Sequence, residues 1–334
     1  MDEDHGQRLP PPAAHIEERI RARGAISYAE FMRMALYHPD GGYYRRDRDR
    51  IGARPETDFY TAYSAGAVFA QLVTAAAVDR LGHAEAAAHT WVELGVDRQG
   101  SLWAGTPEPF AGLLSLGYGE PADIPGKAVV FSNELFDAQP FHRVRFNRGA
   151  WREAGVTLAG GPGGFGETLL PEMTPPVASR SGCLPAEAPE GTTIDLPIGA
   201  ADLLENLASQ NWTGLFLAFD YGKTWEQLVH ECPEGTLRAY SRHRQVASIL
   251  DAPGEQDLTG HICWDWMREI LGGHGFTDLE LLSQEAFFVR YAARTIEQII
   301  SRRPGLPDPD RQRLHQLIHP SNMGRKFQVL AARR

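Results

Sequence analysis

The stretch "VELGVDRQG", residues 92–100, ends an apolar strand in an unusual turn. The strand leads into Glu93, and Gly95 and Gly100 then enclose four residues that carry side chains. A glycine turn takes positive φ readily and leaves no Cβ in the way of a ligand, whereas Val96 is β-branched and stiff. A turn between two glycines after an apolar strand could let a ligand approach the backbone, and Val96 leaves open whether this turn accepts one.

Four further apolar runs share the continuous character of residues 90–94. Strands that are covered on both faces are apolar throughout instead of alternating. The runs lie at residues 128–132, 215–220, 279–283 and 327–331, and helical patterns at 198–210, 223–231, 264–272 and 284–302 separate most of them. Alternating strands and helices predict a doubly wound, mostly parallel, Rossmann-like sheet.

The segment between the first two runs is short. A sheet that threads two more strands there needs three connections of about 10–12 residues and two strands of about 5, or roughly 40 residues in all. Residues 95–127 supply 33, interrupted by turn sequences. We therefore expect a helix near residues 110–116 and a five-stranded core that lacks two edge strands, with residues 90–94 and 128–132 as parallel neighbours.

The rest of the chain predicts additions to this core. Ser27 and Glu30 form a capping box that opens a helix, and residues 141–158 read as a β-hairpin. The glycine-rich stretch after the hairpin lacks the Lys-Ser/Thr of a phosphate loop and is interpreted as a flexible loop. The predicted parts are a disordered tail (1–15), an N-terminal helical cap (16–86), an α/β core (87–140 and 192–334), and an inserted hairpin and Gly/Pro-rich region (141–191).

Composition excludes several classes of protein. The 334 residues, 43% of them hydrophobic, are ample for a buried core, and a formal net charge of −10 argues against a nucleic-acid surface. Three widely spaced cysteines argue against a zinc site, so no metal is expected. The sequence has no run of about 18 apolar residues, so we expect no membrane insertion. Residues 1–15 match neither a secretory signal nor a basic transit peptide, which predicts a cytoplasmic protein.

Eight phrases carry a resemblance to one family. They are "ALYHPDGGYY", "TDFYTAYSAGAVFAQL", "WVELG", "FSNELFDAQPFHRV", "AFDYG", "GTLRAYSRHR", "GEQDLTGHICW" and "HPSNMGRKFQVLA". With them the chain resembles the MidA-like S-adenosyl-L-methionine (SAM)-dependent methyltransferases over about residues 16–332. Mitochondrial members of that family are complex I assembly factors that methylate an arginine of a partner subunit. The resemblance implies a class I methyltransferase fold, SAM as cofactor, and methyl transfer to an arginine of a protein partner.

The resemblance also assigns cofactor-binding residues. Glu93, Gly95 and Gly100 fall in the cofactor turn, and Asp58 and Thr61 match a loop that the family places over its active site. The family's turn reads "ELGPGRGTL", whereas this chain has the longer "ELGVDRQGSL".

Three departures bear on cofactor binding. Val96 should crowd the methionine end of SAM, and Asp97 should repel its carboxylate. The acidic residue that ends the second strand in this fold and binds the ribose has no clear counterpart, because Glu108 and Glu120 stand in turn-like sequence. Two hypotheses follow: an active SAM-dependent methyltransferase acting on a protein arginine, or a non-catalytic relic that has lost SAM binding and serves as a protein-binding or assembly factor.

"SNELFDAQP", residues 132–140, supplies the candidate catalytic residues. It follows a strand's carboxyl end, where open α/β sheets place ligands. Asn133, Glu134 and Asp137 could surround a guanidinium, which carboxylates hold by bidentate hydrogen bonds. Alternatively, Asn133 and Glu134 cap a following helix. Asp220 ends another strand, and it either lines the cofactor cleft or merely terminates that strand.

Overall fold

The computed structural model describes residues 11–46, 62–98, 100–104, 109–160, 164–242, 244–302 and 307–334. The chain forms two compact units, each assembled from three segments. We call residues 49–137, 201–225 and 262–334 the sheet unit, and residues 1–48, 138–200 and 226–261 the hairpin unit.

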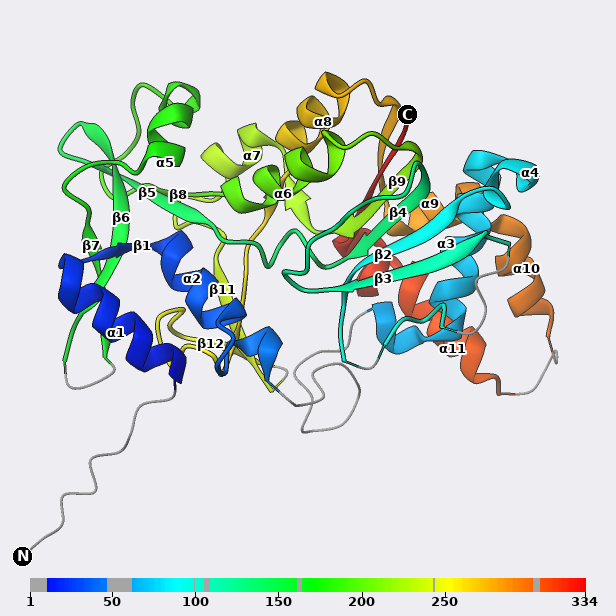
Figure 1. Cartoon of the computed structure of the whole chain (residues 1–334), viewed down its shortest axis with the longest axis horizontal. Coiled ribbons are helices and arrows are strands. Elements are labelled where there is room, and N and C mark those ends of the chain that lie inside the picture. The colour runs from blue at the N-terminus through cyan, green and yellow to red at the C-terminus, as the bar shows by residue number, and fades with distance from the viewer. Residues whose placement is uncertain are drawn as a thin grey trace, which may run out of the picture. The chain divides into compact units, whose positions relative to one another are not determined.

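The sheet unit is built on six strands (Figure 1). Their spatial order is β15 (Thr277–Ser283), β16 (Gln328–Arg333), β9 (Thr213–Asp220), β4 (Lys127–Asn133), β2 (Thr90–Val96) and β3 (Gly112–Gly117). Strands β3, β2, β4 and β9 are parallel, and β16 runs antiparallel to both of its neighbours. The five predicted strands are confirmed, as is the parallel pairing of β2 with β4.

Strand β3 corrects the expected helix at residues 110–116 and the five-stranded core. It pairs with β2 on the side away from β4, so one strand, not two, occupies the described part of residues 95–127. A short apolar run cannot be assigned to helix or strand by periodicity alone. The segment from Gly112 to Gly117 has only six residues including both glycines, which suits a strand and is short for a helix.

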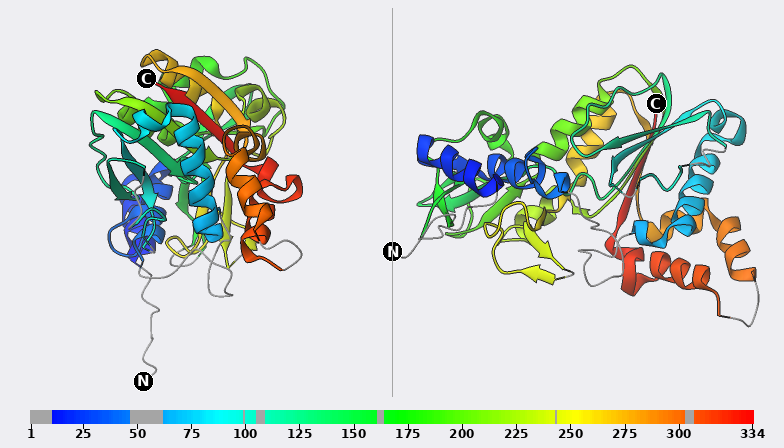
Figure 2. Two further views of the ribbon diagram at one scale, coloured as in Figure 1. Left: turned by 90° about the vertical axis from the view of Figure 1, so that its right-hand side faces the viewer. Right: turned by 60° about the horizontal axis from the view of Figure 1, so that its bottom comes forward.

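Helices on one face of this sheet enclose an aromatic core. They are α3 (Ala67–Leu81), α9 (Gln284–Tyr291), α10 (Ala293–Ser301) and α11 (Pro309–Ile318). Phe69 on α3 packs edge-on against Phe219 of β9 and Phe288 of α9, with ring centroids 5.6 and 6.2 Å apart. Helix α8 (Trp264–Gly273) covers the opposite face (Figure 2). The β-sheet is thus buried on both sides, which explains its continuously apolar strands.

Shorter elements complete the sheet unit. They are η2 (Ala62–Ala65), α4 (His83–Ala86), the parallel pair β10 (Gly222–Lys223) and β14 (Ile262–Cys263), and η4 (Pro320–Gly324).

The hairpin unit contains the predicted β-hairpin. Strands β5 (His142–Asn147) and β6 (Ala150–Leu158) are joined by Arg148 and Gly149, both at positive φ (53° and 77°), as a two-residue type I′ turn requires. Strands β1 (Ile26–Ser27) and β7 (Phe165–Leu169) pair with β6, and β8 (Thr193–Leu196) pairs with β5.

Helices and a second small sheet accompany this hairpin. The helices are α1 (Pro11–Arg23), α2 (Tyr28–Tyr37), η1 (Tyr43–Arg45), α5 (Pro175–Arg180) and η3 (Ser181–Cys183). The sheet comprises β11 (Arg238–Ser241), β12 (Arg244–Val246) and β13 (Asp257–Thr259). Figure 2 shows the β11–β12 hairpin in yellow beside the blue N-terminal helices. Helices α6 (Ile198–Ala208) and α7 (Trp225–His230) contain residues of both units.

The units divide the chain differently from the predicted parts. Helix α2 packs on β5 and β6, whereas α3 packs on β9, so the expected N-terminal cap is shared between the units. Helix α1 begins at Pro11, inside the segment expected to be disordered. Proline suits the first turn of a helix because its φ is already helical and its missing N–H would be unpaired there.

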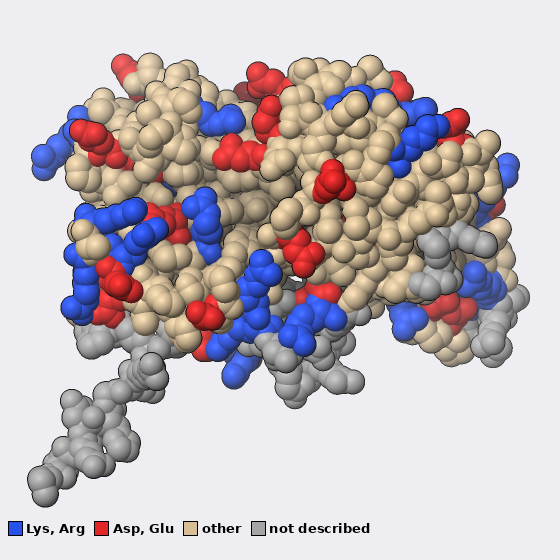
Figure 3. All heavy atoms as spheres, in the orientation of Figure 1, with Lys and Arg blue, Asp and Glu red and all other residues tan. Residues whose placement is uncertain are grey.

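Several charged side chains of the hairpin unit form ion pairs. Figure 3 shows basic side chains interspersed with acidic ones over its visible face. On α1, Arg19 and Arg23 both contact Glu30, and Arg21 contacts Glu17. None of the helices in the described ranges is long and apolar enough to cross a bilayer.

A buried ion pair joins three segments of the hairpin unit. Arg143 donates from Nε and Nη2 to the two oxygens of Asp195, at 2.8 and 3.2 Å. Asp195 also accepts the backbone N–H groups of Thr236 and Leu237. Burial alone would lower the pKa of Arg143, but the adjacent Asp195 carboxylate raises it above its ordinary value. Arg143 therefore stays charged although it is buried, and its charge depends on the contact with Asp195.

Replacing Arg143 should destabilise the protein strongly. Arg143→Met leaves the Asp195 carboxylate buried without its cation, and we expect a loss of about 3–5 kcal/mol in the free energy of unfolding. Arg145→Met is the matched control, since Arg145 contacts Glu167 from a half-exposed position on the same strand and should cost less than about 1 kcal/mol. Urea unfolding measures both, and equal losses would contradict the assignment.

Candidate active site

Strand β2 has a bulge at Gly95, within the 92–100 stretch. Leu94 pairs with Leu116 of β3, and Val96 with Gly117, so Gly95 has no partner of its own. Its φ is +73°, which glycine adopts without strain. A Cβ at Gly95 would lie 3.0 Å from Cδ1 of Leu135. Val96 therefore remains part of the strand, and the bulge packs tightly against the residues that follow β4.

The turn after the bulge is held by its own polar groups. The Gly100 N–H donates to the Asp97 carbonyl at 2.9 Å, and the Asp97 carboxylate accepts the Arg98 N–H at 2.8 Å. The Ser101 hydroxyl accepts the Trp103 N–H, and Trp103 Nε1 donates to Thr74 on α3. Gly100 has a φ of +82° and open space around its Cβ position.

Glu93 is a buried carboxylate with no hydrogen bond of normal geometry among the described residues, although the Ser101 hydroxyl lies near it. Its side chain is fully buried on β2, and no hydrogen bond reaches either carboxylate oxygen. Burial raises the pKa of Glu93 to about 7, although the nearby Ser101 hydroxyl lowers it slightly. Buried acceptors normally find a partner, so a site of this kind suits a donor group from a ligand.

Asn133 presents a second such acceptor on the same face of the sheet. Residues in register on parallel strands point to the same side; Phe131 is in register with Glu93, and Asn133 lies two residues farther along β4. Asn133 Nδ2 donates to Glu134 Oε1 at 3.0 Å, but its Oδ1 accepts no hydrogen bond in the described structure. Glu93 and Asn133 thus offer buried oxygens at the carboxyl edge of neighbouring strands.

The residues after β4 form a turn, not a helix. The expected alternative, in which Asn133 and Glu134 cap a following helix, is therefore wrong. Glu134 has a φ of +51°, a left-handed conformation that costs a non-glycine residue about 1–2 kcal/mol. Its N–H donates to the Phe219 carbonyl at 2.9 Å, and its carbonyl accepts the Tyr118 hydroxyl at 3.1 Å. Strained residues of this kind cluster at functional sites.

Asp220 supports this turn from the end of β9. Its Oδ2 accepts the N–H groups of Phe136 and Asp137 at 3.0 and 3.4 Å, and its Oδ1 accepts that of Tyr221 at 2.9 Å. Burial raises the pKa of Asp220, while these three N–H groups oppose the rise. The carboxylate is fully buried and bonded to the backbone; its assignment to the cofactor stays a prediction.

A residue that sequence reasoning set aside lies at the end of β3. Strand β3 stops at Gly117, and the carboxylate of Glu120 reaches back to accept the Gly117 N–H at 2.9 Å. An exposed carboxylate therefore stands at the end of the second parallel strand although the strand itself ends in glycine. The sequence Gly-Tyr-Gly-Glu at residues 117–120 indicates this position of Glu120, once residues 112–117 are read as a strand.

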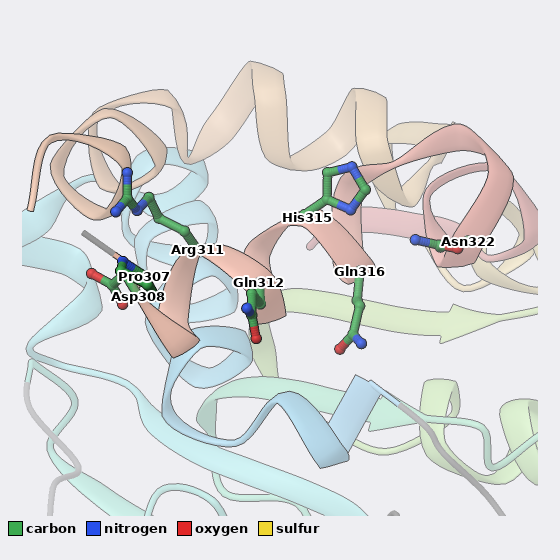
Figure 4. A pocket seen from close by; sticks show the side chains of 7 residues that line it. All are labelled: Pro307, Asp308, Arg311, Gln312, His315, Gln316 and Asn322. Carbon is green, nitrogen blue, oxygen red and sulfur yellow. The ribbon is translucent and has the colours of Figure 1, made fainter. Parts of the chain in front are cut away.

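The structure thus brings together Glu93, Gly95, Asn133, Glu134 and Asp220 at one edge of the sheet. Asp137 belongs to the same turn and is buried. Asp58 and Thr61 lie outside the described residues. A separate hollow in the sheet unit is formed by α11 and η4 (Figure 4), with a lining of Pro307, Asp308, Arg311, Gln312, His315, Gln316 and Asn322.

Comparison with known proteins decides the family. Residues 116–281, about half of the chain, match a family described as S-adenosyl-L-methionine-dependent methyltransferases. The protein arginine methyltransferase NDUFAF7 of zebrafish mitochondria is 24% identical over 95% of this chain and 85% of its own length, and the human protein is 22% identical over 96% and 83%. The chain belongs to this methyltransferase family.

The fold agrees with that of solved structures. A Burkholderia thailandensis protein bound to S-adenosyl-homocysteine superposes with a TM-score of 0.84 at 23% identity, covering 97% of this chain and 92% of the other. A second structure from that organism gives a TM-score of 0.79 at 24% identity, covering 97% and 91%. The expected class I methyltransferase fold is confirmed.

The comparisons correct one expectation and weaken one hypothesis. The curated relatives are mitochondrial by name, which contradicts the cytoplasmic location expected from residues 1–15. Addressing segments are short and leave no mark on folded units, so the folded part of the sequence carried no information on this point. The relic hypothesis relied on a missing second strand and a crowding Val96. The methyltransferase has that strand as β3, and Val96 lies within β2.

The residues at this edge fit SAM, the cofactor of the family. Glu93 and Asn133 hold buried acceptor oxygens that lack a donor, as the ammonium of a methionine moiety would supply. Gly95 and Gly100 keep the neighbouring backbone free of Cβ atoms. These acceptor oxygens are therefore suited to a cationic, hydrogen-bond-donating group of a ligand.

The raised pKa of Glu93 predicts a pH-dependent stability in the absence of cofactor. A carboxyl group with a pKa near 7 in the folded state and near 4.5 when unfolded stabilises the fold below pH 4.5 and loses that contribution as the pH rises through 7. Between pH 5 and 8, wild type should therefore lose on the order of 3 kcal/mol relative to Glu93→Gln, an isosteric variant that cannot ionise. Urea unfolding at several pH values measures this, and parallel curves would refute it.

Proposed function

We propose that this methyltransferase transfers the methyl group of SAM to a side-chain nitrogen of arginine in a protein partner. The observation that carries the proposal is the carboxylate of Glu134, held in a left-handed turn at the sheet edge next to buried Asn133 and Asp137. Carboxylates in this setting suit a guanidinium. The names of the curated relatives support arginine as the methyl acceptor.

In this proposal one group of residues binds SAM and another holds the methyl acceptor. Glu93 and Asn133 hold the methionine end of SAM by its ammonium, which favours the ionised form of Glu93. Glu120 is placed to accept the ribose hydroxyls at the end of β3, in the role of the acid that this strand lacks. Asp58 and Thr61, which lie outside the described residues, stay predicted cofactor contacts.

The reaction depends on positioning more than on a strong base. SAM, when bound, supplies an electrophilic methyl group on a sulfonium. Arginine stays protonated in proteins, so the acceptor must be oriented as a cation. Glu134 and Asp137 would fix the guanidinium and stabilise charge as one nitrogen forms its bond to the methyl carbon and the carbon–sulfur bond breaks. The attacking nitrogen would give up one proton to the carboxylate that holds it, so that the methylated guanidinium keeps a single positive charge and SAM leaves as neutral S-adenosylhomocysteine.

Cofactor binding and acceptor identity can be tested directly. Calorimetry should give saturable binding of S-adenosylhomocysteine with micromolar affinity, because the bulge at Gly95 keeps Val96 out of the turn. Tritiated SAM should label protein in an extract of the source organism, and acid hydrolysis should recover the label as methylarginine. Absence of binding would restore the relic hypothesis, and label on another residue would refute arginine as the acceptor.

Glu134→Gln should abolish methyl transfer with little change in stability. The side chain is half-buried and caps no helix, so its removal creates no cavity, while the guanidinium loses its ionic partner. We expect labelling to fall at least 100-fold and the melting temperature to shift by less than about 2 °C. The exposed Glu297→Gln on α10 is the matched control and should keep full activity. Comparable turnover by Glu134→Gln would remove this residue from the mechanism.

A further inference from the structure

The turn of residues 134–137 has no regular secondary structure to fix its shape. Among its backbone N–H groups, that of Glu134 is bonded to the Phe219 carbonyl, and those of Phe136 and Asp137 are bonded to the side chain of Asp220. All of these partners lie at the carboxyl end of β9. The conformation of the turn is therefore imposed from the neighbouring strand.

The carboxylate of Asp220 uses both of its oxygens in hydrogen bonds to the backbone. It is fully buried, and its two oxygens accept three backbone N–H groups, two from the turn and one from Tyr221. The three N–H groups offset part of the cost of burying this carboxylate, whose pKa burial still raises. An apolar side chain at this position would leave the three donors buried and unpaired, and a longer acid would displace the turn.

The left-handed backbone of Glu134 needs such an anchor. A non-glycine residue keeps a positive φ only where the surroundings determine it at several points. Here the Glu134 N–H donates to the Phe219 carbonyl, and the Glu134 carbonyl accepts the Tyr118 hydroxyl. The Asp220 carboxylate accepts the N–H groups of Phe136 and Asp137. If the last contact is lost, the turn can relax to negative φ and redirect the Glu134 side chain.

We propose that Asp220 is a positioning residue, whose buried carboxylate holds the turn of residues 134–137 so that Glu134 faces the methyl acceptor. The proposal rests on the function proposed for Glu134. It assigns Asp220 to the acceptor side of the site, and it predicts that the residue affects turnover without contacting SAM.

The test separates holding the turn from binding the cofactor. Asp220→Ala should lower protein labelling by tritiated SAM at least 30-fold and leave the dissociation constant for S-adenosylhomocysteine within threefold of wild type. Hydrogen–deuterium exchange should rise at least tenfold at residues 136, 137 and 221. Asp220→Asn should retain most activity, because its amide oxygen can still accept from Phe136 and Asp137, and only Tyr221 should exchange faster.

Val129→Ala is the matched control for stability. Val129 is fully buried on β4, away from the turn, so this variant weakens the same sheet without removing an acceptor. It should not change exchange at residues 136 and 137 selectively. If Asp220→Ala does not fold, the comparison is made between Asp220→Asn and Val129→Ala, where faster exchange at Tyr221 alone supports the proposal and no difference overturns it.

The outcomes distinguish this proposal from the proposed function. Loss of S-adenosylhomocysteine binding in Asp220→Ala would show a cofactor contact and overturn it, as would wild-type labelling together with wild-type exchange. If wild type itself transfers no methyl group, the proposed function fails, and exchange confined to residues 136, 137 and 221 still decides whether Asp220 holds the turn.

Discussion

The register of β4 between β2 and β9 is the constraint on which the site depends. Phe131 pairs with Glu93 on one side and with Leu217 on the other, so the three strands end at a common edge. Polar residues that follow each strand then meet there without any help from long loops. A slip of one residue would turn Glu93 to the opposite face of the sheet and leave the edge without its acceptor.

Two buried carboxylates at this edge illustrate opposite solutions to the same cost. Removing a carboxylate from water is unfavourable unless hydrogen bonds replace the lost hydration. Asp220 receives three N–H groups from the chain and serves the fold, whereas Glu93 receives none from the described residues. The two carboxylates therefore differ in how far the described residues replace their lost hydration.

The bulge at Gly95 determines where Val96 lies. A residue that leaves the ladder as a bulge shifts the pairing of the residues after it by one position. Gly95 can take this place because its positive φ carries no penalty and because no Cβ strikes Leu135. The side chain of Val96 is then placed by its pairing with Gly117 and not by the turn.

By itself, the sequence determined the five long strands, the parallel neighbours β2 and β4, the hairpin and the family, because continuous apolar runs and multi-residue phrases are local properties of the chain. It also placed Glu134 and Asp137 after a strand's carboxyl end. It missed β3, since six half-buried residues carry no decisive periodicity, and it missed Glu120 for the same reason. Only the tertiary structure decided that Gly95 leaves the ladder, that residues 134–137 form a strained turn instead of a helix, and that Asp220 holds that turn. Each of these three features depends on hydrogen bonds between segments that are far apart in the sequence. The residue pattern of one strand does not reveal which distant residue will bond to it.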